Sequence, residues 1–232
     1  MNAQGAAGQR VDAEEHVVGN AAGISDVHLA TERYYTRKAL RYGATPVGVD
    51  WPCAASQESR IAQLLRGFDF EAPRSLNDLG CGYGAALDAI AKLHPRADID
   101  YLGLDLSAEM VRLAQQEWAG HARATFMVAS ISPRVADYSI ASGIFNVKLG
   151  WSRERWEELV RRTLTGLGAT SRRGFAVNFL MPGGAPEIPE LYRTPAEPWV
   201  RYCEQECATR VEVVLDYGLP EFTLIARKAS QL

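Results

Sequence analysis

The chain has 232 residues, of which 47% are hydrophobic and 23% are charged, and its formal net charge is −3 at pH 7. These values suit one globular α/β domain with a full apolar core. The negative net charge offers no basic field for phosphates, so we expect a small-molecule substrate and neither nucleic acid nor a membrane as partner. Because the sequence lacks a leader pattern and an apolar run of about 20 residues, we expect a cytoplasmic protein. We also expect a monomer or a homodimer.

The four cysteines form no recognisable metal-binding or disulfide pattern. None belongs to a C-x-x-C pair near a histidine cluster, so we expect reduced thiols and no metal. Cys203 and Cys207 stand four residues apart on a predicted helix, where two small apolar side chains explain them, and we assign them no function.

The N-terminal third is predicted to be a tail and a helical lid, spanning residues 1–73. Residues 1–26 are rich in alanine and glycine and poor in large apolar groups, which is typical of a tail or a lid. A helical pattern covers residues 27–42. A second amphipathic helix, starting near residue 56, is predicted from apolar positions at i, i+3, i+4 and i+7, namely Ile61, Leu64, Leu65 and Phe68.

From residue 74 onward, short apolar runs alternate with helical patterns, from RSLNDL to GFAVNFL. Such alternation requires crossover connections and therefore a parallel sheet with helices on both faces. This alternation is interrupted at residues 181–202 by a proline-rich insertion. The insertion contains MPGGAPEIPELYRTPAEP and the start of a short helix. Two further strands, RVEVVLDY and EFTLIARK, are predicted to be joined by a tight turn at residues 218–220. The last strand would then be antiparallel.

A glycine-rich motif closes the first predicted strand and opens a helix. It has the form G-x-G-x-G at Gly80, Gly82 and Gly84, with Asp78 before it, and it differs from the dinucleotide pattern G-x-G-x-x-G. Glycines let a ligand approach the backbone, and a helix N-terminus directs free N–H groups at it. Asp105 ends the strand DIDYLGLDL, 23 residues after Gly82, where an acid can accept from the two hydroxyls of a ribose.

At DLGCGYG (78–84) and GLDLSAEMV (103–111) the sequence resembles the class I S-adenosylmethionine (SAM)-dependent methyltransferases. The resemblance covers about residues 74–228 and implies an α/β fold with a doubly wound, mostly parallel seven-stranded sheet, an antiparallel last strand and an N-terminal helical cover. Residues 74–232 would form the SAM-binding domain. The cofactor-binding residues that it implies are Asp78, Gly80, Cys81, Gly82, Asp105, Leu106, Met110, Ser130, Ile131, Ser142 and Gly143. The family often has an acid near the adenine after the third strand, where this chain has Ser130 and Ile131.

The reaction would occur beyond the ends of the fourth and fifth strands, because ligands of open parallel sheets bind at the carboxyl ends. Asn146 and Asn178 close these strands, and with Tyr35 they are the catalytic candidates, although amides are poor proton acceptors. The candidates for binding substrate or closing a lid are Tyr34, Tyr42, Trp51 and Gln57, with Arg60 beyond them, and Glu187, Glu190, Tyr192 and Trp199 in the insertion.

Two reactions are compatible with these residues. The first is methyl transfer from SAM to a small metabolite of specialised biosynthesis, which needs alignment more than a base. The alternative is intramolecular cyclisation of SAM to azetidine-2-carboxylate with release of methylthioadenosine. A regulatory module that binds SAM without turnover stays open, whereas a nicotinamide oxidoreductase is disfavoured by the missing G-x-x-G spacing and by the terminal hairpin.

Overall fold

The structure is a computed structural model that describes residues 23–183 and 188–229. Its centre is a seven-stranded sheet with the strand order β3-β2-β1-β4-β5-β7-β6. The strands are β1 (Arg74–Leu79), β2 (Ile99–Asp105), β3 (Ala124–Val128), β4 (Ala136–Ala141), β5 (Ser171–Leu180), β6 (Thr209–Val214) and β7 (Glu221–Lys228). β7 is antiparallel to both β5 and β6, and the pairs from β3 to β5 are parallel. The predicted fold class is therefore confirmed.

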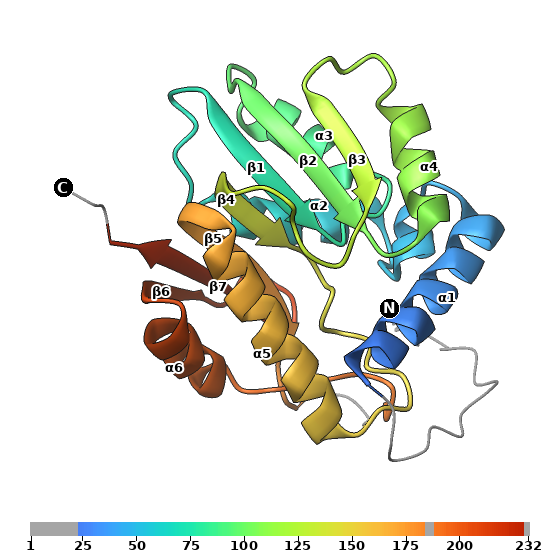
Figure 1. Cartoon of the computed structure of the whole chain (residues 1–232), viewed down its shortest axis with the longest axis vertical. Coiled ribbons are helices and arrows are strands. Elements are labelled where there is room, and N and C mark those ends of the chain that lie inside the picture. The colour runs from blue at the N-terminus through green and yellow to red at the C-terminus, as the bar shows by residue number, and fades with distance from the viewer. Residues whose placement is uncertain (1–22, 184–187, 230–232) are drawn as a thin grey trace, which may run out of the picture.

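Helices cover both faces of the sheet, and α1 lies near the carboxyl ends of its strands (Figure 1). They are α1 (Ile24–Tyr42), the short 3-10 helix η1 (Pro46–Val49), α2 (Ala54–Leu65), α3 (Ala85–Leu93), α4 (Ala108–Glu117), α5 (Arg153–Ala169) and α6 (Glu197–Glu206). One apolar core joins α2, α3 and α4 to residues such as Leu76 and Tyr101, and a second core joins α5 and α6 to Phe175 and Phe179. Alternating strand residues supply the two cores, because successive side chains of a strand point to opposite faces.

Local signals explain where several helices begin. The Ser107 side chain accepts from the Met110 N–H at the start of α4, and Ser152 accepts from the Arg155 N–H at the start of α5. Each serine satisfies one backbone donor that the helix itself leaves unpaired. Among the residues that the structure describes, no helix has the length and apolar character needed to cross a membrane.

Two predicted boundaries were wrong. The second helix ends at Leu65 rather than continuing to Phe68, because Gly67 passes so close to β7 that an added Cβ would lie 2.3 Å from Ile225 Cγ2. Phe68 instead stacks on Tyr138, with ring centroids 4.3 Å apart. The connection between β6 and β7 is also longer than a tight turn and spans residues 215–220.

The parallel strands place their carboxyl ends at one edge of the sheet. Leu79 of β1 pairs with Leu104 of β2, so the glycine motif that follows β1 lies beside Asp105. Two isolated bridges bring the insertion itself to the same edge, Leu191 with Val147 and Arg193 with Leu180. This edge is where the candidate site lies.

Candidate functional site

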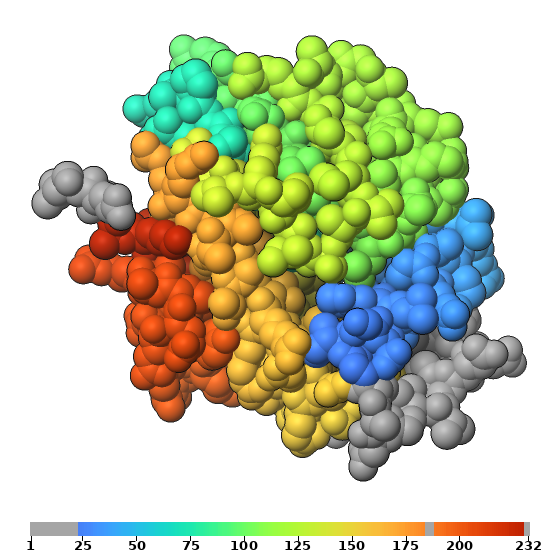
Figure 2. All heavy atoms as spheres, viewed as in Figure 1, coloured from blue at the N-terminus to red at the C-terminus, as the bar shows by residue number. Residues whose placement is uncertain are grey.

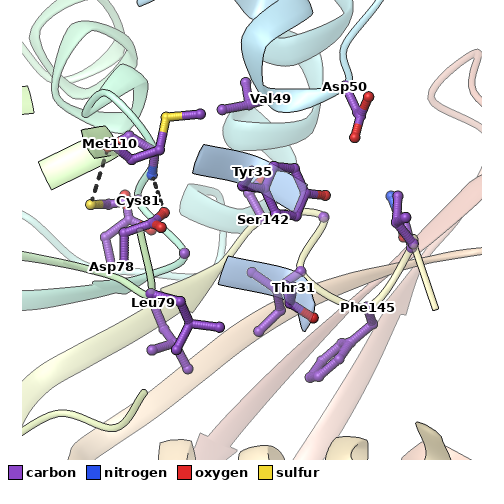
Figure 3. A pocket seen from close by; sticks show the side chains of 18 of the residues that line it. Thr31, Tyr35, Val49, Asp50, Asp78, Leu79, Cys81, Met110, Ser142 and Phe145 are labelled. Atoms are coloured by element: carbon purple, nitrogen blue, oxygen red, sulfur yellow. Dashed lines mark hydrogen bonds between the residues drawn. The ribbon is translucent and has the colours of Figure 1, made fainter. Parts of the chain in front are cut away.

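A cavity of about 180 Å³ lies at the carboxyl ends of β1, β2 and β4. Its opposite wall is made by α1, η1 and the start of α2, so the predicted N-terminal cover faces the sheet edge (Figure 3). In Figure 3, Tyr35 and Thr31 project from α1 toward Ser142 and Phe145, while Asp78, Cys81 and Met110 lie on the opposite side. The cavity therefore brings together segments from the first 60 residues and from three strand ends.

The glycine motif is bent tightly against its surroundings. Gly80 and Gly82 have φ angles of 74° and 54°, a left-handed conformation that favours glycine. A Cβ on Gly80 would lie 2.2 Å from Ile144 Cγ2, so no larger residue fits there without rearrangement. The Gly82 N–H donates to Asp105 Oδ2 over 2.9 Å. The motif and the acid of the next strand thus form one hydrogen-bonded unit.

Asp105 is placed to receive a polar ligand group. Its Oδ1 accepts from the Ser107 N–H at 2.9 Å, and each carboxylate oxygen retains a further lone pair for a ligand hydroxyl. Burial raises the pKa of Asp105, while the hydrogen bonds from Ser107 and Gly82 oppose this rise. Leu106 and Met110 line the cavity beside it and offer an apolar surface. A carboxylate next to apolar side chains fits a ribose and its adenine.

The start of α3 completes this side of the cavity. Ala85 and Ala86, its first two residues, line the cavity directly after the glycine motif. The N-terminus of a helix carries partial positive charge and free N–H groups, which suit a ligand carboxylate. These groups fit the methionine end of the predicted cofactor.

Asp78 is buried behind the glycine motif and accepts a hydrogen bond from the Tyr101 hydroxyl at 2.5 Å. Burial raises the pKa of Asp78 to about 7, the Tyr101 hydrogen bond opposes the rise, and Asp105 adds to it. Its charge is therefore unfavourable in the folded protein near neutral pH.

We expect Asp78→Asn to make the ligand-free protein more stable relative to the wild type at pH 8 than at pH 5. Because the folded-state pKa is above the ordinary value of 3.8, the folded protein holds a proton that the unfolded chain releases between about pH 4 and 7. The wild type therefore loses stability as the pH rises through this window, at about 1.4 kcal/mol per unit of pKa shift, and Asp78→Asn does not. Urea unfolding at both pH values measures this, with the exposed Asp98→Asn as the matched control. Equal differences at the two pH values would contradict the prediction.

A buried hydrogen-bonded cluster connects β7, β5 and α2 at the cavity wall. Glu221 accepts from Arg60 Nε and Nη2 at 2.8 and 2.6 Å, and the two residues are 0% and 5% exposed. The Asn178 Nδ2 donates to Glu221 Oε2 at 2.8 Å, and Asn178 Oδ1 accepts from the Gly143 N–H at 2.7 Å. The structure therefore places Asn178, a predicted catalytic residue, outside the cavity lining, where it positions the loop after β4.

The same hydrogen-bonded cluster holds Trp51 at the cavity wall. The Arg60 guanidinium lies over the Trp51 ring, 4.0 Å from its centroid. The ring also packs on the loop after β4, since a Cβ on Gly143 would lie 2.4 Å from Trp51 Cζ2. Trp51, Arg60 and Gly143 all line the cavity, as predicted for the segment that follows η1.

Three polar side chains on the cavity wall have no hydrogen-bond partner among the residues that the structure describes. They are Thr31 through Oγ1, Ser142 through Oγ and Asn146 through both Oδ1 and Nδ2. Asn146 is 6% exposed, and burying an amide with neither atom bonded is costly unless a ligand pairs with it. These atoms are therefore available to a ligand in the cavity.

On α1, only part of the predicted aromatic cover faces the cavity. Tyr35 lines it, near Asp50, which pairs with Lys38 at 2.5 Å. Burial raises the pKa of Tyr35 well above 10, so its hydroxyl stays protonated. Tyr34 and Tyr42 do not line the cavity and instead flank Lys38, with their ring centroids 5.4 and 5.6 Å from its Nζ.

The other predicted residues divide in the same way. Gln57 lines the cavity and accepts from the Tyr83 hydroxyl at 2.6 Å. The predicted cofactor residues on the cavity wall are Asp78, Gly80, Cys81, Gly82, Asp105, Leu106, Met110, Ser130, Ser142 and Gly143. Ile131 lies outside this lining, with 56% of its side chain exposed.

The predicted closing residues of the insertion also lie elsewhere. Trp199 belongs to α6 and is buried in the core, where its Nε1 donates to Thr194 Oγ1. The Tyr192 hydroxyl donates to Glu157. Glu190 is absent from the cavity lining, to which its neighbour Leu191 contributes. Glu187 falls outside the described residues.

Sequence reasoning missed several residues on the wall. His28 and Thr31 precede Tyr35 by seven and four residues, which is the spacing of one helix face, so this stripe of α1 could have been found from its period. Glu221 could not have been found, because its partner Arg60 is 161 residues away in the chain.

The charge on the cavity wall is predominantly negative. Its lining holds four acidic side chains, of Asp50, Asp78, Asp105 and Glu221. Asp50 pairs with Lys38, Glu221 pairs with Arg60, and burial raises the pKa of Asp78 to about 7, so Asp105 carries most of the charge that no cation offsets. Such a field suits a cationic ligand and opposes a polyphosphate. No group of three or more histidine, cysteine or acidic side chains suited to a metal is found within residues 23–183 and 188–229.

Comparisons with known proteins agree with this geometry. The profile of a family described as a methyltransferase domain matches residues 77–165. The chain is 42% identical over 160 residues to a Mycobacterium tuberculosis protein named as a candidate methyltransferase, Rv1506c, covering 68% of this chain and 95% of that protein. It is 31% identical over 139 residues to a trans-aconitate 2-methyltransferase of Rhodopseudomonas palustris, covering 59% of this chain and 50% of that protein.

A solved structure shows the same fold at low identity. The magnesium protoporphyrin IX methyltransferase of Synechocystis, with bound S-adenosylhomocysteine (SAH), superposes with a TM-score of 0.63 at 15% identity. The match covers 89% of this chain and 100% of that chain.

Proposed function

Because the chain belongs to the class I SAM-dependent methyltransferase family, we propose that it transfers the methyl group of SAM to a small metabolite of specialised biosynthesis. Asn146 carries this proposal, since its buried amide has a free donor and a free acceptor on the cavity wall. Apolar side chains adjoin it, with Phe145 and Val147 on either side in the chain and Leu191 on the same wall. The combination suits a second substrate with an apolar body and a polar group.

The residues of this chain would act mainly by positioning. SAM supplies a methyl group already activated by its sulfonium, so in-line transfer requires an aligned nucleophile and the exclusion of water. Asp105 and the glycine motif would hold the ribose and the methionine end, and Asn146 would orient the acceptor. Tyr35 keeps its proton and can act only as a donor or as an aromatic wall.

The charge of the cavity narrows the choice of acceptor. Trans-aconitate carries several carboxylates, whereas the only guanidinium on the described wall of this cavity, that of Arg60, is neutralised by Glu221, and Asp105 adds a negative charge. Like charges in a partly buried site raise the free energy of binding. We therefore propose a neutral or cationic acceptor, in contrast to the relatives named for trans-aconitate.

We expect Asn146→Ala to lower the turnover number by about tenfold and to leave SAM affinity nearly unchanged, because its amide hydrogen bonds go to the acceptor. SAH formation with the first acceptor that supports turnover measures the former, and calorimetry with SAM alone measures the latter. Equal losses in both quantities would instead make Asn146 a cofactor-binding residue.

The cyclisation of SAM to azetidine-2-carboxylate remains a second proposal. The aromatic faces of Tyr35 and Trp51 on the cavity wall favour it, because a desolvated sulfonium gains about 2 kcal/mol over a π-face. The same faces serve methyl transfer equally well, so a product analysis must separate the two reactions.

The deciding experiment is incubation of the purified protein with SAM alone, followed by mass spectrometry. Methylthioadenosine together with an equimolar four-membered imino acid would establish cyclisation and overturn methyl transfer. SAH that forms only when an acceptor is added supports methyl transfer.

We also propose that residues 1–73 form the tail and helical lid, and that residues 74–232, with the insertion at 181–202, form the SAM-binding domain. The cytoplasmic location and the monomeric or homodimeric state stay predictions.

A further inference from the structure

A second cavity, of about 200 Å³, lies on the sheet face opposite α3. Residues 129–135 join β3 to β4 without a helix, so on the face turned to the viewer β1, β2 and β3 carry a loop (Figure 1). In Figure 2 this loop, in yellow-green, lies beside α1 in blue and α5 in orange. Arg134 fastens the loop to the sheet through hydrogen bonds to Asn77 Oδ1 and the Asp100 carbonyl, at 3.1 and 2.8 Å. The cavity remains between this loop, α5 and α1.

The two cavities adjoin each other. Five residues line both of them, namely His28, Leu79, Ser130, Leu159 and Thr163. The deeper wall of the second cavity is largely apolar, with Leu104 of β2, Leu167 of α5 and Ile24 of α1. An apolar cavity of about 150 Å³ in a protein can hold a benzene molecule, so this one has room for a substituted ring.

His28 stands at the junction of the cavities. It lies on the same face of α1 as Thr31 and Tyr35, which line the first cavity. Among the described residues, none forms a hydrogen bond with its ring, so no partner within this part of the chain holds its nitrogens. Sequence reasoning found no strong base near the site, and His28 is the residue on the shared wall that can accept a proton near neutral pH.

We propose that the second cavity holds the apolar ring of the methyl acceptor, a neutral phenol-like molecule, and that His28 accepts the proton of its hydroxyl. The inference rests on the proposed methyl transfer. The hydroxyl oxygen forms a bond to the methyl carbon, the carbon–sulfur bond breaks with its electron pair going to sulfur, and the hydroxyl proton moves to a ring nitrogen of His28. The products are the methyl ether, SAH and a protonated histidine, which then releases its proton to solvent.

The surroundings keep this histidine neutral. Burial lowers the pKa of His28 below its ordinary value of 6.5. From α5 the facing charged group is Arg162, which pairs with Glu158, and on α1 the next turn carries Glu32. The sheet and the loop contribute uncharged groups to the second cavity. On the wall of the first cavity, Asp50 pairs with Lys38, Asp78 accepts from the Tyr101 hydroxyl and Asp105 accepts from the Gly82 N–H.

The subsite is tested with 4-fluorophenol as the probe, observed by ¹⁹F NMR with SAH present. Gly166→Leu fills the second cavity from α5, where a Cβ would already lie 3.3 Å from Ile131 Cδ1, and leucine favours a helix more than glycine does. We expect this variant to weaken probe binding at least about tenfold with unchanged SAH affinity. Ala169→Leu, on the exposed side of the same helix, should bind the probe like the wild type. Absence of saturable binding to the wild type, or equal binding by Gly166→Leu, would overturn the subsite.

The role of His28 is tested by the pH dependence. Probe affinity for the wild type should fall roughly threefold or more from pH 8 to pH 5, as His28 is protonated, and His28→Gln should show no such fall. With SAM in place of SAH, formation of 4-fluoroanisole should be slower in His28→Gln by about 100-fold and lose its rise with pH. If the probe binds but the wild type and His28→Gln behave alike, the role of His28 as proton acceptor is overturned and the subsite is retained. Because binding is measured without turnover, failure of methyl transfer itself gives a distinct result.

Discussion

Replacing Glu221 with alanine is expected to lower the free energy of unfolding by about 3–5 kcal/mol, the typical cost of leaving a buried charge unpaired. The Arg60 guanidinium would lose its carboxylate partner while remaining 5% exposed between α2 and β7. Asn178 would lose the acceptor for its Nδ2 as well. Urea denaturation of the ligand-free protein measures the change.

A matched control and a rescue keep this prediction specific. Glu212→Ala removes an exposed pair with Arg227 on the neighbouring β6 and should cost at most about 1 kcal/mol. The double variant Arg60→Met, Glu221→Leu leaves no unpaired charge and should recover much of the loss. A loss in Glu221→Ala no larger than that of Glu212→Ala would contradict the importance that we give to the buried pair.

Replacing Asp105 with alanine is expected to weaken SAM binding by about 1.5–3 kcal/mol, as for hydrogen bonds to a charged group. This corresponds to roughly a 10- to 150-fold rise in Kd. Two causes combine, because the ribose loses its acceptor and the Gly82 N–H loses the carboxylate that holds the glycine motif in place. Calorimetric titration with SAM measures the change.

Asp98→Ala is the control for this variant. Asp98 lies just before the same strand, is exposed and pairs with Arg123, so SAM affinity should stay at the wild-type value. Asp105→Asn keeps one acceptor oxygen and should fall between the two. Unchanged affinity in Asp105→Ala would remove Asp105 from the cofactor site.

Local patterns were sufficient to predict the alternating order of strands and helices and the edge of the sheet where the cavity lies. The alternation of apolar runs and helical patterns gave the order of strands and helices, and parallel strands necessarily end at one edge. The pairing of Gly82 with Asp105 could therefore be anticipated from two motifs 23 residues apart. The error at Phe68 arose because a repeating apolar pattern does not show where a helix meets another element, here at Gly67 against β7.

Residue type alone does not distinguish the roles of Asn146 and Asn178. Asn146 and Asn178 both follow or close a strand near the same edge, and the sequence treats them alike. In the structure, both amide atoms of Asn178 form hydrogen bonds, with the Gly143 N–H and with Glu221. Both amide atoms of Asn146 are without a hydrogen-bond partner among the described residues and lie at the cavity. Which amide is available depends on partners from distant segments, and those appear only in the folded chain.

The sequence by itself determined the fold class, the glycine motif, the acid that follows the second strand and the kind of ligand that they suit. The fold class follows from short-range periodicity and the glycine motif from the backbone geometry that glycine permits, whereas the kind of ligand is what the resemblance to the SAM-dependent methyltransferases implies. The tertiary structure alone decided which face of α1 meets the sheet edge, how Arg60 is neutralised by Glu221, and that a loop replaces a helix between β3 and β4. These features depend on packing between segments far apart in the chain, where burial and hydrogen-bond satisfaction select one arrangement among many that the local pattern allows.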